Sequence, residues 1–312
     1  MSAWTSSLGL SANSVKYRFY TCDVFTPKRF GGNPLAVLPE AAGLSGQQMQ
    51  QVAAEFNYSE TTFVLPAERG HTNRVRIFTP AREVPFAGHP NIGTAFVLAS
   101  TGAIDLSGPQ TTITFEEDAG LVAVTISWQN NGLLRCELQA PQPLTLGPVV
   151  MPEMAAAALS LDVKEIRLET HPPQVAGVGL PFLVVELSGP EALAEACFNT
   201  KVMESFLQSG IAPDILLYIR DDGGFDIRCR MFAPLDGVPE DPATGSANCA
   251  LAALLGHYDP ANSGDFNWRI GQGVEMGRPS TLEARVSKNE GKVIATYIGG
   301  DCIMVSEGAI TV

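Results

Sequence analysis

The residues of this sequence whose types and spacing could carry out chemistry are few. Glu60 lies where a predicted helix gives way to a predicted strand, His89 and Ser246 each follow a glycine at the start of an apolar helix, and Asp241 comes shortly before the second of these helices. A carboxyl group buried against apolar walls has a raised pKa and can take a proton from one carbon and return it to another. The sequence therefore predicts Glu60, His89 and Asp241 as acid–base groups and Ser246 as a hydrogen-bond donor, for chemistry that needs no cofactor.

The two glycines, Gly88 and Gly245, predict a binding site at the same positions. Each opens a helix whose first N–H groups have no partner within the helix and whose N-terminus carries a partial positive charge. If both ends face one cleft, they form a site for a small anionic metabolite such as a carboxylate. The net charge of −13 opposes an anion at long range, so these local N–H groups must supply the attraction.

Each candidate residue also has a purely structural explanation when it is taken alone. Glu60 could be an exposed carboxylate near a helix end, Asp241 a turn residue before a proline, His89 a helix cap and Ser246 an ordinary N-cap. Only the combination of all four points to a site.

The elements that must position these residues alternate between strands and helices. Ser45 and Gln48 have the spacing of a capping box at the start of a helix that leads towards Glu60. Two further helices start at Gly88 and Gly245 and are apolar. Strands are expected at 17–25, 35–38, 61–65, 73–78, 111–128 and 133–139, with a turn at 130–132.

An internal repeat with an offset near 150 residues indicates the architecture. The run from Arg76 to Pro80 matches the run from Arg230 to Pro234, and each run is followed by one of the two apolar helices. A strand-rich unit can bury such a helix only if its sheet curls around it. The repeat thus predicts an α+β protein of two pseudo-equivalent domains, each a rolled β-sheet around a central α-helix.

Composition excludes several classes of function. The chain has 312 residues, with 20 Lys and Arg against 33 Asp and Glu and no basic cluster, which argues against nucleic acid as a partner. No apolar run approaches the roughly 18 residues of a membrane span, and the first residues lack the features of a signal peptide, so we expect no membrane association and a cytoplasmic location. The six cysteines and four histidines lack metal-ligand spacing, so neither a metal nor a disulfide is expected.

Four motifs together resemble those of the phenazine-biosynthesis PhzF-like isomerase family, which has the diaminopimelate epimerase-like fold. They are Gly32-Asn33-Pro34, Glu60 to Val64, Arg76 to Gly93 and Glu240 to Ser246. The resemblance implies a homodimer of two-domain subunits in which the last strand, near 303–312, returns to the first domain. We expect a flexible tail at 1–15, an N-terminal lobe at 16–128 with the strand 303–312, and a C-terminal lobe at 129–302.

The resemblance also implies roles for the candidate residues. It places the general acid–base carboxylate at Glu60 and substrate contacts at the positions of His89, Asp241 and Ser246. Sister epimerases and racemases of this fold use two cysteines, but the matching positions here are Ala87 and Thr244. Neither side chain can act as a base near neutral pH, which disfavours inversion by a thiol pair.

The sequence leaves three functions open. The leading one is a cofactor-independent isomerase that moves a proton on a small carboxylate-bearing metabolite, amino-acid-like or cyclic. The second is an amino-acid racemase or epimerase with a carboxylate base, and the third is a non-catalytic binding protein on the same fold, although the presence of all four polar residues argues against it. The pocket walls are expected from loops such as 116–120 and 177–182, whose contacts the sequence does not define.

Overall fold

The computed structural model describes residues 14–129, 134–221 and 223–312. The expected turn at 130–132 and nearly all of the expected tail at 1–15 lie outside these residues. The described helices are α1 (Gly46–Phe56), α2 (Gly88–Ser100), α3 (Pro152–Ala158), α4 (Pro190–Glu195), α5 (Thr200–Gln208) and α6 (Gly245–Tyr258).

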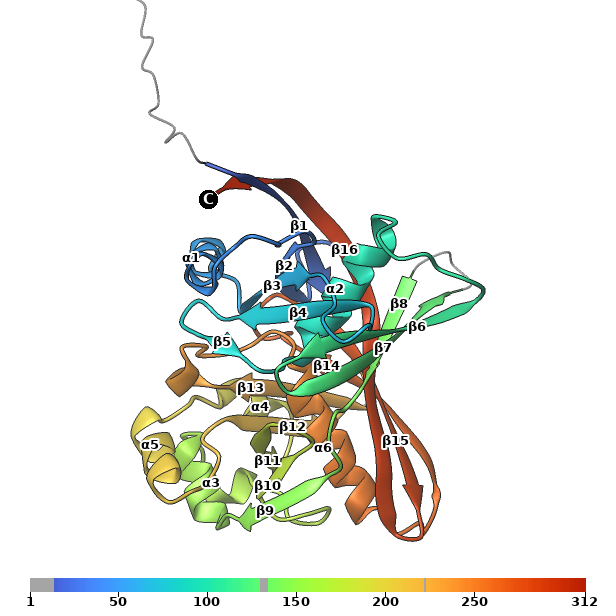
Figure 1. The fold of residues 1–312 in the computed structure, drawn as a ribbon. Helices are drawn as coiled ribbons and strands as arrows, with labels where there is room; N and C mark the ends of the chain where they lie inside the picture. Colours follow the sequence, from blue (N-terminus) through green and yellow to red (C-terminus); the bar gives the residue numbers. More distant parts are fainter. Residues whose placement is uncertain (1–13, 130–133, 222) are drawn as a thin grey trace, which may run out of the picture.

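The strands form one continuous curved sheet that passes through both halves of the molecule (Figure 1). Its order is β1-β2-β3-β4-β6-β7-β8-β16-β15-β14-β13-β12-β11-β10-β9, with the short β5 beside β4. The strands of the first half are β1 (Lys16–Val24), β2 (Asn33–Leu38), β3 (Glu60–Leu65), β4 (Asn73–Phe78), β5 (Glu83–Val84), β6 (Gln110–Glu117), β7 (Gly120–Trp128) and β8 (Leu134–Gln139). Those that follow are β9 (Thr145–Val149), β10 (Gln174–Gly177), β11 (Pro181–Glu186), β12 (Ile215–Arg220), β13 (Ile227–Phe232), β14 (Gly264–Gln272), β15 (Ser280–Asn289) and β16 (Lys292–Thr311).

The two halves of the sheet repeat the same pattern of pairing. In the first half β2 is parallel to β3, β3 is antiparallel to β4, and β4 is parallel to β6. In the second half β11 is parallel to β12, β12 is antiparallel to β13, and β13 is parallel to β14. The register agrees as well, since Thr61 lies opposite Phe78 and Ile215 lies opposite Phe232. The predicted internal repeat is therefore present in the fold.

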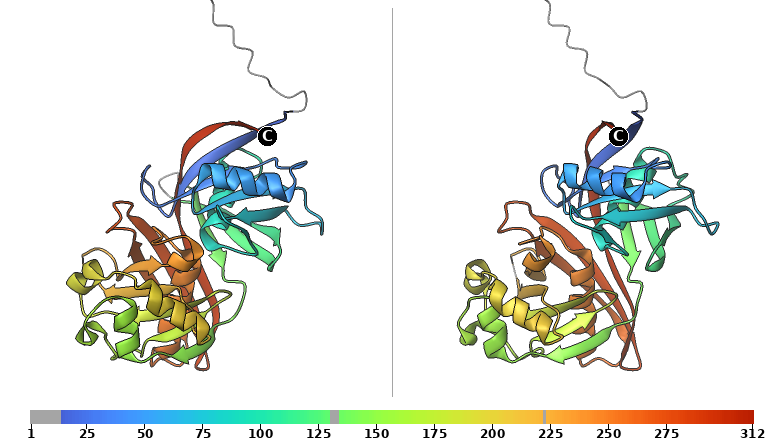
Figure 2. Two further views of the ribbon diagram at one scale, coloured as in Figure 1. Left: turned by 90° about the vertical axis from the view of Figure 1, so that its left-hand side faces the viewer. Right: turned by 60° about the vertical axis from the view of Figure 1, so that its left-hand side comes forward.

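Each half wraps its sheet around one apolar helix, as the repeat predicts. In α2 every residue from Gly88 to Leu98 is buried, and α6 is buried from Ala247 to Gly256. α2 packs on β1, β7 and β8, while α6 packs on β10, β15 and β16. Figure 2 shows the halves as two lobes, joined along the side where β16 runs. The α+β fold class with a helix enclosed in each half is confirmed.

The long strand β16 connects the lobes. Its first part pairs with β15, Tyr297–Asp301 pairs with β8, and its last part pairs with β1 from Cys302 to Thr311. β8 pairs with β7 and packs on α2, although it follows residue 128. We therefore propose that the first lobe consists of β1 to β8 together with the end of β16, and that the second lobe starts after Gln139.

Two local predictions have different outcomes. The capping box is confirmed, because Ser45 accepts a hydrogen bond from the Gln48 N–H and the Gln48 side chain caps the Ser45 N–H. The single strand predicted over 111–128 is wrong, because the segment forms β6 and β7 joined by a tight turn. That turn depends on Gly120, whose φ of +126° is unfavourable for other residues. No helix in the described part of the chain is long and apolar enough to cross a membrane.

Candidate active site

The N-termini of α2 and α6 meet at the interface between the lobes. A Cβ placed on Gly88 would lie 3.0 Å from the Ser246 nitrogen and 3.2 Å from the Gly245 Cα. The residues preceding the helices, Ala87 and Thr244, are extended, and neither side chain caps its helix. Two positive helix ends with unpaired N–H groups thus lie in van der Waals contact. The sequence predicts that both ends face one cleft, and the structure shows the two ends next to each other.

Glu60 reaches this junction because of the way α1 ends. Asn57 takes up the left-handed conformation, with φ +53°, and its N–H bonds the Ala53 carbonyl, which stops the helix and directs the chain into β3. Glu60 is the first residue of β3, and its Oε2 lies 3.4 Å from Nδ1 of His89. The Glu60 side chain is 19% exposed. Burial, followed by the negative charge of Asp241, raises the pKa of Glu60 to about 8.

His89 lies in the first turn of α2 and is 4% exposed. Burial lowers the pKa of His89 to about 3, so the imidazole is neutral near neutral pH. Its Nε2 has no hydrogen-bond partner among the described residues. A neutral imidazole donates a hydrogen bond from one ring nitrogen and accepts one at the other.

Asp241 sits across the junction from Glu60 and is well supplied with donors. Its Oδ1 accepts from Asn33 Nδ2 at 2.9 Å and from Ser59 Oγ at 3.2 Å, and its Oδ2 accepts from the Thr244 hydroxyl. Burial raises the pKa of Asp241 to about 6, while these three hydrogen bonds oppose the rise. Of the two carboxyl groups, Asp241 has the donors that stabilise a charge, so Glu60 retains the proton near neutral pH.

The structure brings together all the residues that the sequence singled out for chemistry. Glu60 contacts His89, Asp241 influences the protonation of Glu60, and Gly88 touches both Gly245 and Ser246. The first lobe supplies Glu60, Gly88 and His89, and the second lobe supplies the rest. The site is therefore complete only when the two lobes are in contact.

The sequence did not predict the residues that hydrogen-bond Asp241 and fix its position. Asn33 links the lobes by donating to both Asp241 Oδ1 and the Ala243 carbonyl, each at 2.9 Å. Asn33 belongs to the Gly32-Asn33-Pro34 motif, but its partners are more than 200 residues away in the chain. Ser59 adjoins Glu60 and has no signal of its own in the sequence. The spacing along the sequence carries no signal for either contact.

Gln272, at the end of β14, was also missed. Its Oε1 accepts from the Thr244 N–H at 3.1 Å and from Asn248 Nδ2 at 2.7 Å, and its Nε2 donates to the Asp241 carbonyl at 2.7 Å. Asn248 in turn donates to the Thr244 carbonyl at 2.9 Å. One amide side chain thus fixes the first turn of α6 relative to Asp241.

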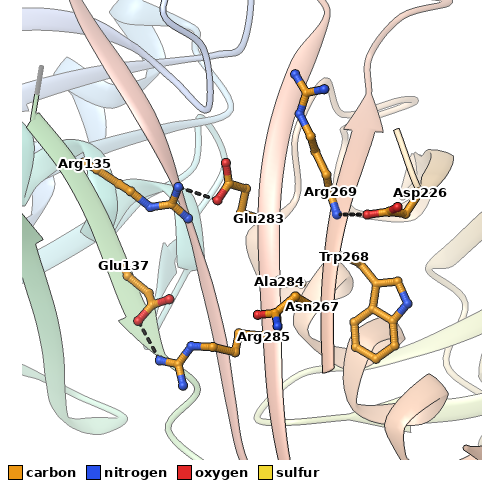
Figure 3. Close-up of a pocket in the computed structure, with 9 residues that line it drawn as sticks. All are labelled: Arg135, Glu137, Asp226, Asn267, Trp268, Arg269, Glu283, Ala284 and Arg285. Carbon is orange, nitrogen blue, oxygen red and sulfur yellow. Dashed lines mark hydrogen bonds and ion pairs between the residues drawn. The ribbon is translucent and has the colours of Figure 1, made fainter. Parts of the chain in front are cut away.

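The surface hollow of about 560 Å³ shown in Figure 3 lies elsewhere. It is on the outer face of β8, β15 and β14, because the alternate residues of these strands, such as Leu138 and Leu282, face the core. Its charges are largely paired within the protein: Arg135 pairs with Glu283, and Arg285 pairs with Glu137 at 2.8 Å. None of the predicted site residues lines it.

The described residues offer no metal site, and neither residue that precedes α2 or α6 is a cysteine. No group of three His, Cys, Asp or Glu side chains among them is arranged to hold a metal ion. Ala87 and Thr244, which match the cysteines of sister epimerases, directly precede α2 and α6 and so flank the place where the helices meet. A base at this junction must therefore be a group other than a thiol at these two positions.

Comparison with known proteins agrees with this architecture. The family described as phenazine biosynthesis-like protein matches residues 22–308. A trans-2,3-dihydro-3-hydroxyanthranilate isomerase of Pseudomonas aeruginosa is 34% identical over 292 residues, which cover 94% of this chain and 98% of that protein.

Solved structures share the fold. A PhzF-family phenazine biosynthesis protein of Bacillus anthracis superposes with a TM-score of 0.85 at 24% identity, over 96% of this chain and all of the other. A hydroxyproline epimerase of Agrobacterium vitis, solved with bound trans-4-hydroxy-L-proline, has a TM-score of 0.62 at 14% identity, over 95% and 93% of the chains. Because the family match spans most of the sequence and the Pseudomonas relative is similar over nearly its whole length, this chain belongs to the phenazine biosynthesis-like (PhzF) family and is an isomerase.

Proposed function

We propose that this isomerase works without a cofactor and moves a proton between two atoms of a small carboxylate-bearing metabolite, amino-acid-like or cyclic, with Glu60 as the proton carrier. The observation that carries the proposal is the position of Glu60, a largely buried carboxyl group with a raised pKa beside two helix N-termini in contact. The helix ends bind an anion, and the carboxyl group supplies a base at a fixed place beside it.

The proposed reaction assigns a task to each residue. The substrate carboxylate accepts hydrogen bonds from N–H groups at the starts of α2 and α6, around Gly88 and Gly245, with the hydroxyl of Ser246 as a further donor. The reaction starts from the minority of molecules in which Glu60 is ionised at neutral pH, a fraction that grows as the pH rises towards 8. Ionised Glu60 removes a proton from one carbon, and the electron pair of that C–H bond moves into the substrate's conjugated system. Glu60 then gives this proton, or one that it has exchanged with water, to a second atom and returns to its ionised form. No atom is gained or lost, so the reaction is an isomerisation.

His89 and Asp241 set the state of the base. Neutral His89 hydrogen-bonds the substrate or Glu60 without adding a charge. Ionised Asp241 raises the pKa of Glu60, which makes Glu60 a stronger base once it has lost its proton. Asp241 is itself held in place by Asn33 and Thr244.

The first compound to test is the substrate in the name of the Pseudomonas relative, trans-2,3-dihydro-3-hydroxyanthranilate, followed by a panel of amino and hydroxy acids. Glu60→Gln keeps the shape of the side chain but removes the base. We expect turnover to fall by about a hundredfold or more, with substrate affinity nearly intact. Glu55→Gln, which changes an exposed carboxylate on α1, is the control and should leave turnover unchanged. Unchanged turnover in Glu60→Gln would refute the assignment of the base.

A second candidate function is epimerisation of an amino acid with one carboxyl base from each lobe. Ile215 in the second lobe has the same place in the strand register as Thr61 in the first lobe. Asp214, the residue before Ile215, therefore corresponds to Glu60, the residue before Thr61. Burial, and then Asp236, raise the pKa of Asp214 to about 7. Solvent deuterium that enters a stereocentre with inversion, and is lost in Asp214→Asn, would favour this function. Deuterium transfer that persists in Asp214→Asn would favour the single-base isomerase.

The non-catalytic alternative, the homodimer and the cytoplasmic location stay predictions. No particular observation favours a non-catalytic binding protein, and the isomerase family argues against it. The homodimer and the cytoplasmic location rest on the sequence and its resemblance. Light scattering after size exclusion tests the first, and cell fractionation tests the second.

A further inference from the structure

Glu117 is a buried carboxyl group that the proposed reaction does not use. It ends β6, is 4% exposed, and lies beside the side chain of Asn91 in the first turn of α2. Among the described residues neither carboxyl oxygen of Glu117 has a hydrogen-bond partner of normal geometry, and the same holds for Oδ1 of Asn91. An ionised carboxylate in such a place is costly, because it has lost its water and has not gained donors.

The internal repeat shows which residue of the second lobe corresponds to Glu117. β4 pairs with β6 so that Asn73 lies opposite Phe115, and β13 pairs with β14 so that Ile227 lies opposite Ile270. Because residues 73 and 227 are equivalent in the repeat, 115 corresponds to 270 and Glu117 corresponds to Gln272. By the same repeat, Asn91 corresponds to Asn248.

The two asparagines confirm this correspondence by their contacts. Asn91 Nδ2 donates to the Ala87 carbonyl at 2.9 Å, and Asn248 Nδ2 donates to the Thr244 carbonyl at 2.9 Å. In the second lobe Asn248 also donates to Gln272, whose amide completes the brace of α6. In the first lobe a carboxyl group stands where that amide stands.

A single proton resolves the shortage of donors around Asn91. Glu117 and Asn91 face each other with three oxygen acceptors, while Asn91 Nδ2 has one N–H left after its bond to Ala87. A neutral carboxylic acid has one donor and one acceptor side, as an amide has. Its O–H can donate to Asn91 Oδ1, and its carbonyl oxygen can accept the remaining N–H.

We propose that Glu117 is a positioning residue that carries a proton at neutral pH and braces the first turn of α2 as the amide of Gln272 braces the first turn of α6. Through Asn91 and Ala87 it fixes the helix start that carries Gly88 and His89. The inference rests on the proposed function only in taking this helix start as part of the anion site. An ionised Glu117 would also add a negative charge next to a site meant for an anion.

The charged groups around Glu117 agree with a neutral side chain. Burial raises the pKa of Glu117 to about 8, the Asn91 amide opposes the rise, and Asp118 in the following turn adds to it. Arg74 on β4 pairs with Glu68 and Asp118. The first turn of α2 carries no acidic side chain, and its titratable residue His89 is neutral.

The neighbouring Glu116 provides a matched control on the opposite face of β6. Its carboxylate accepts backbone N–H groups of Glu68 and Arg69 at 2.7 Å and of His71 at 3.2 Å. Burial acts to raise the pKa of Glu116, but these hydrogen bonds outweigh it and lower the pKa. Glutamine in place of Glu116 should therefore remove an ionised carboxylate, whereas glutamine in place of Glu117 should remove a protonated carboxyl group.

The direct test is infrared spectroscopy of protonated carboxyl groups at pH 6.5, in a Glu60→Gln background so that Glu60 does not contribute. Asp214 also contributes to the protonated-carboxyl band at this pH, so we expect the band to lose intensity on adding Glu117→Gln and to keep it on adding Glu116→Gln. An unchanged band intensity in the variant that carries Glu117→Gln would overturn the proposal, because Glu117 would then be ionised.

Hydrogen exchange over residues 86–92 tests the bracing role without any substrate. At pH 7 we expect these amides to exchange as slowly in Glu117→Gln as in the wild type. In Glu117→Leu they should exchange about tenfold faster, because the Asn91 side chain loses its partner. Equal exchange in both variants would overturn the bracing role. Neither readout involves turnover, so these outcomes stand apart from those of Glu60→Gln on activity.

Discussion

Glu60→Gln should change how the stability of the protein depends on pH. Glu60 has an ordinary pKa of 4.5 in the unfolded chain and about 8 in the folded protein. The folded state therefore binds the proton more tightly, and the stability that this contributes is full below pH 4.5 and is lost as the pH rises through 8. At about 1.4 kcal/mol per pKa unit, the limit is about 5 kcal/mol. Because the side chain is 19% exposed and shares its proton equilibrium with Asp241, we expect about 2 to 3 kcal/mol.

Urea unfolding at pH 5, 7 and 9 measures this effect without knowledge of the substrate. Glutamine has no proton to lose, so Glu60→Gln should gain stability relative to the wild type as the pH rises from 5 to 9. The control Glu55→Gln, on the exposed face of α1, should show no such trend. A difference between wild type and Glu60→Gln that stays constant over this range would refute the claim that folding raises the pKa of Glu60.

Three further predictions follow from the same contacts. Gly88→Ala places a Cβ 3.0 Å from the facing backbone nitrogen, whereas a Cβ on Gly245 meets its nearest atom at 3.4 Å. Measured on an acid that the wild type converts, kcat/KM should therefore fall about tenfold further in Gly88→Ala than in Gly245→Ala. Asp241→Asn removes the charge that helps to raise the pKa of Glu60, so carboxyl NMR should find Glu60 ionising at lower pH, though still above 4.5 because burial remains. Arg230→Ala should cost about 3 kcal/mol in urea unfolding, because it leaves the partly buried Glu240 without its bidentate partner. A loss below 1 kcal/mol would contradict this last estimate.

The overall architecture was predictable because periodicity and repetition survive in a single sequence. The apolar helices at Gly88 and Gly245 must be enclosed, and the match between Arg76 and Arg230 extends to their roles. Arg76 binds Glu83 through two nitrogens, and Arg230 binds its glutamate in the same way. Local hydrogen-bond chemistry, such as the cap at the start of α1, was predictable for the same reason.

The features that the sequence did not predict depend on contacts between residues that are distant in the chain. The reversal before Gly120 interrupts a strand pattern that continues on both sides, so alternation alone does not show it. Gln272 and Asn33 act on residues in other elements or in the other lobe, and their types occur commonly on surfaces. Glu117 becomes informative only when strand register shows that it replaces an amide.

The most direct test of the central claim is proton exchange in heavy water, followed by NMR. With trans-2,3-dihydro-3-hydroxyanthranilate and the acid panel as probes, the wild type should place solvent deuterium on a carbon of one of them or shift a double bond within it. Glu60→Gln should bind the same compound but exchange at a rate lower by about a hundredfold or more. Exchange in Glu60→Gln at the wild-type rate would contradict the account, because the proton would then be moved by another group.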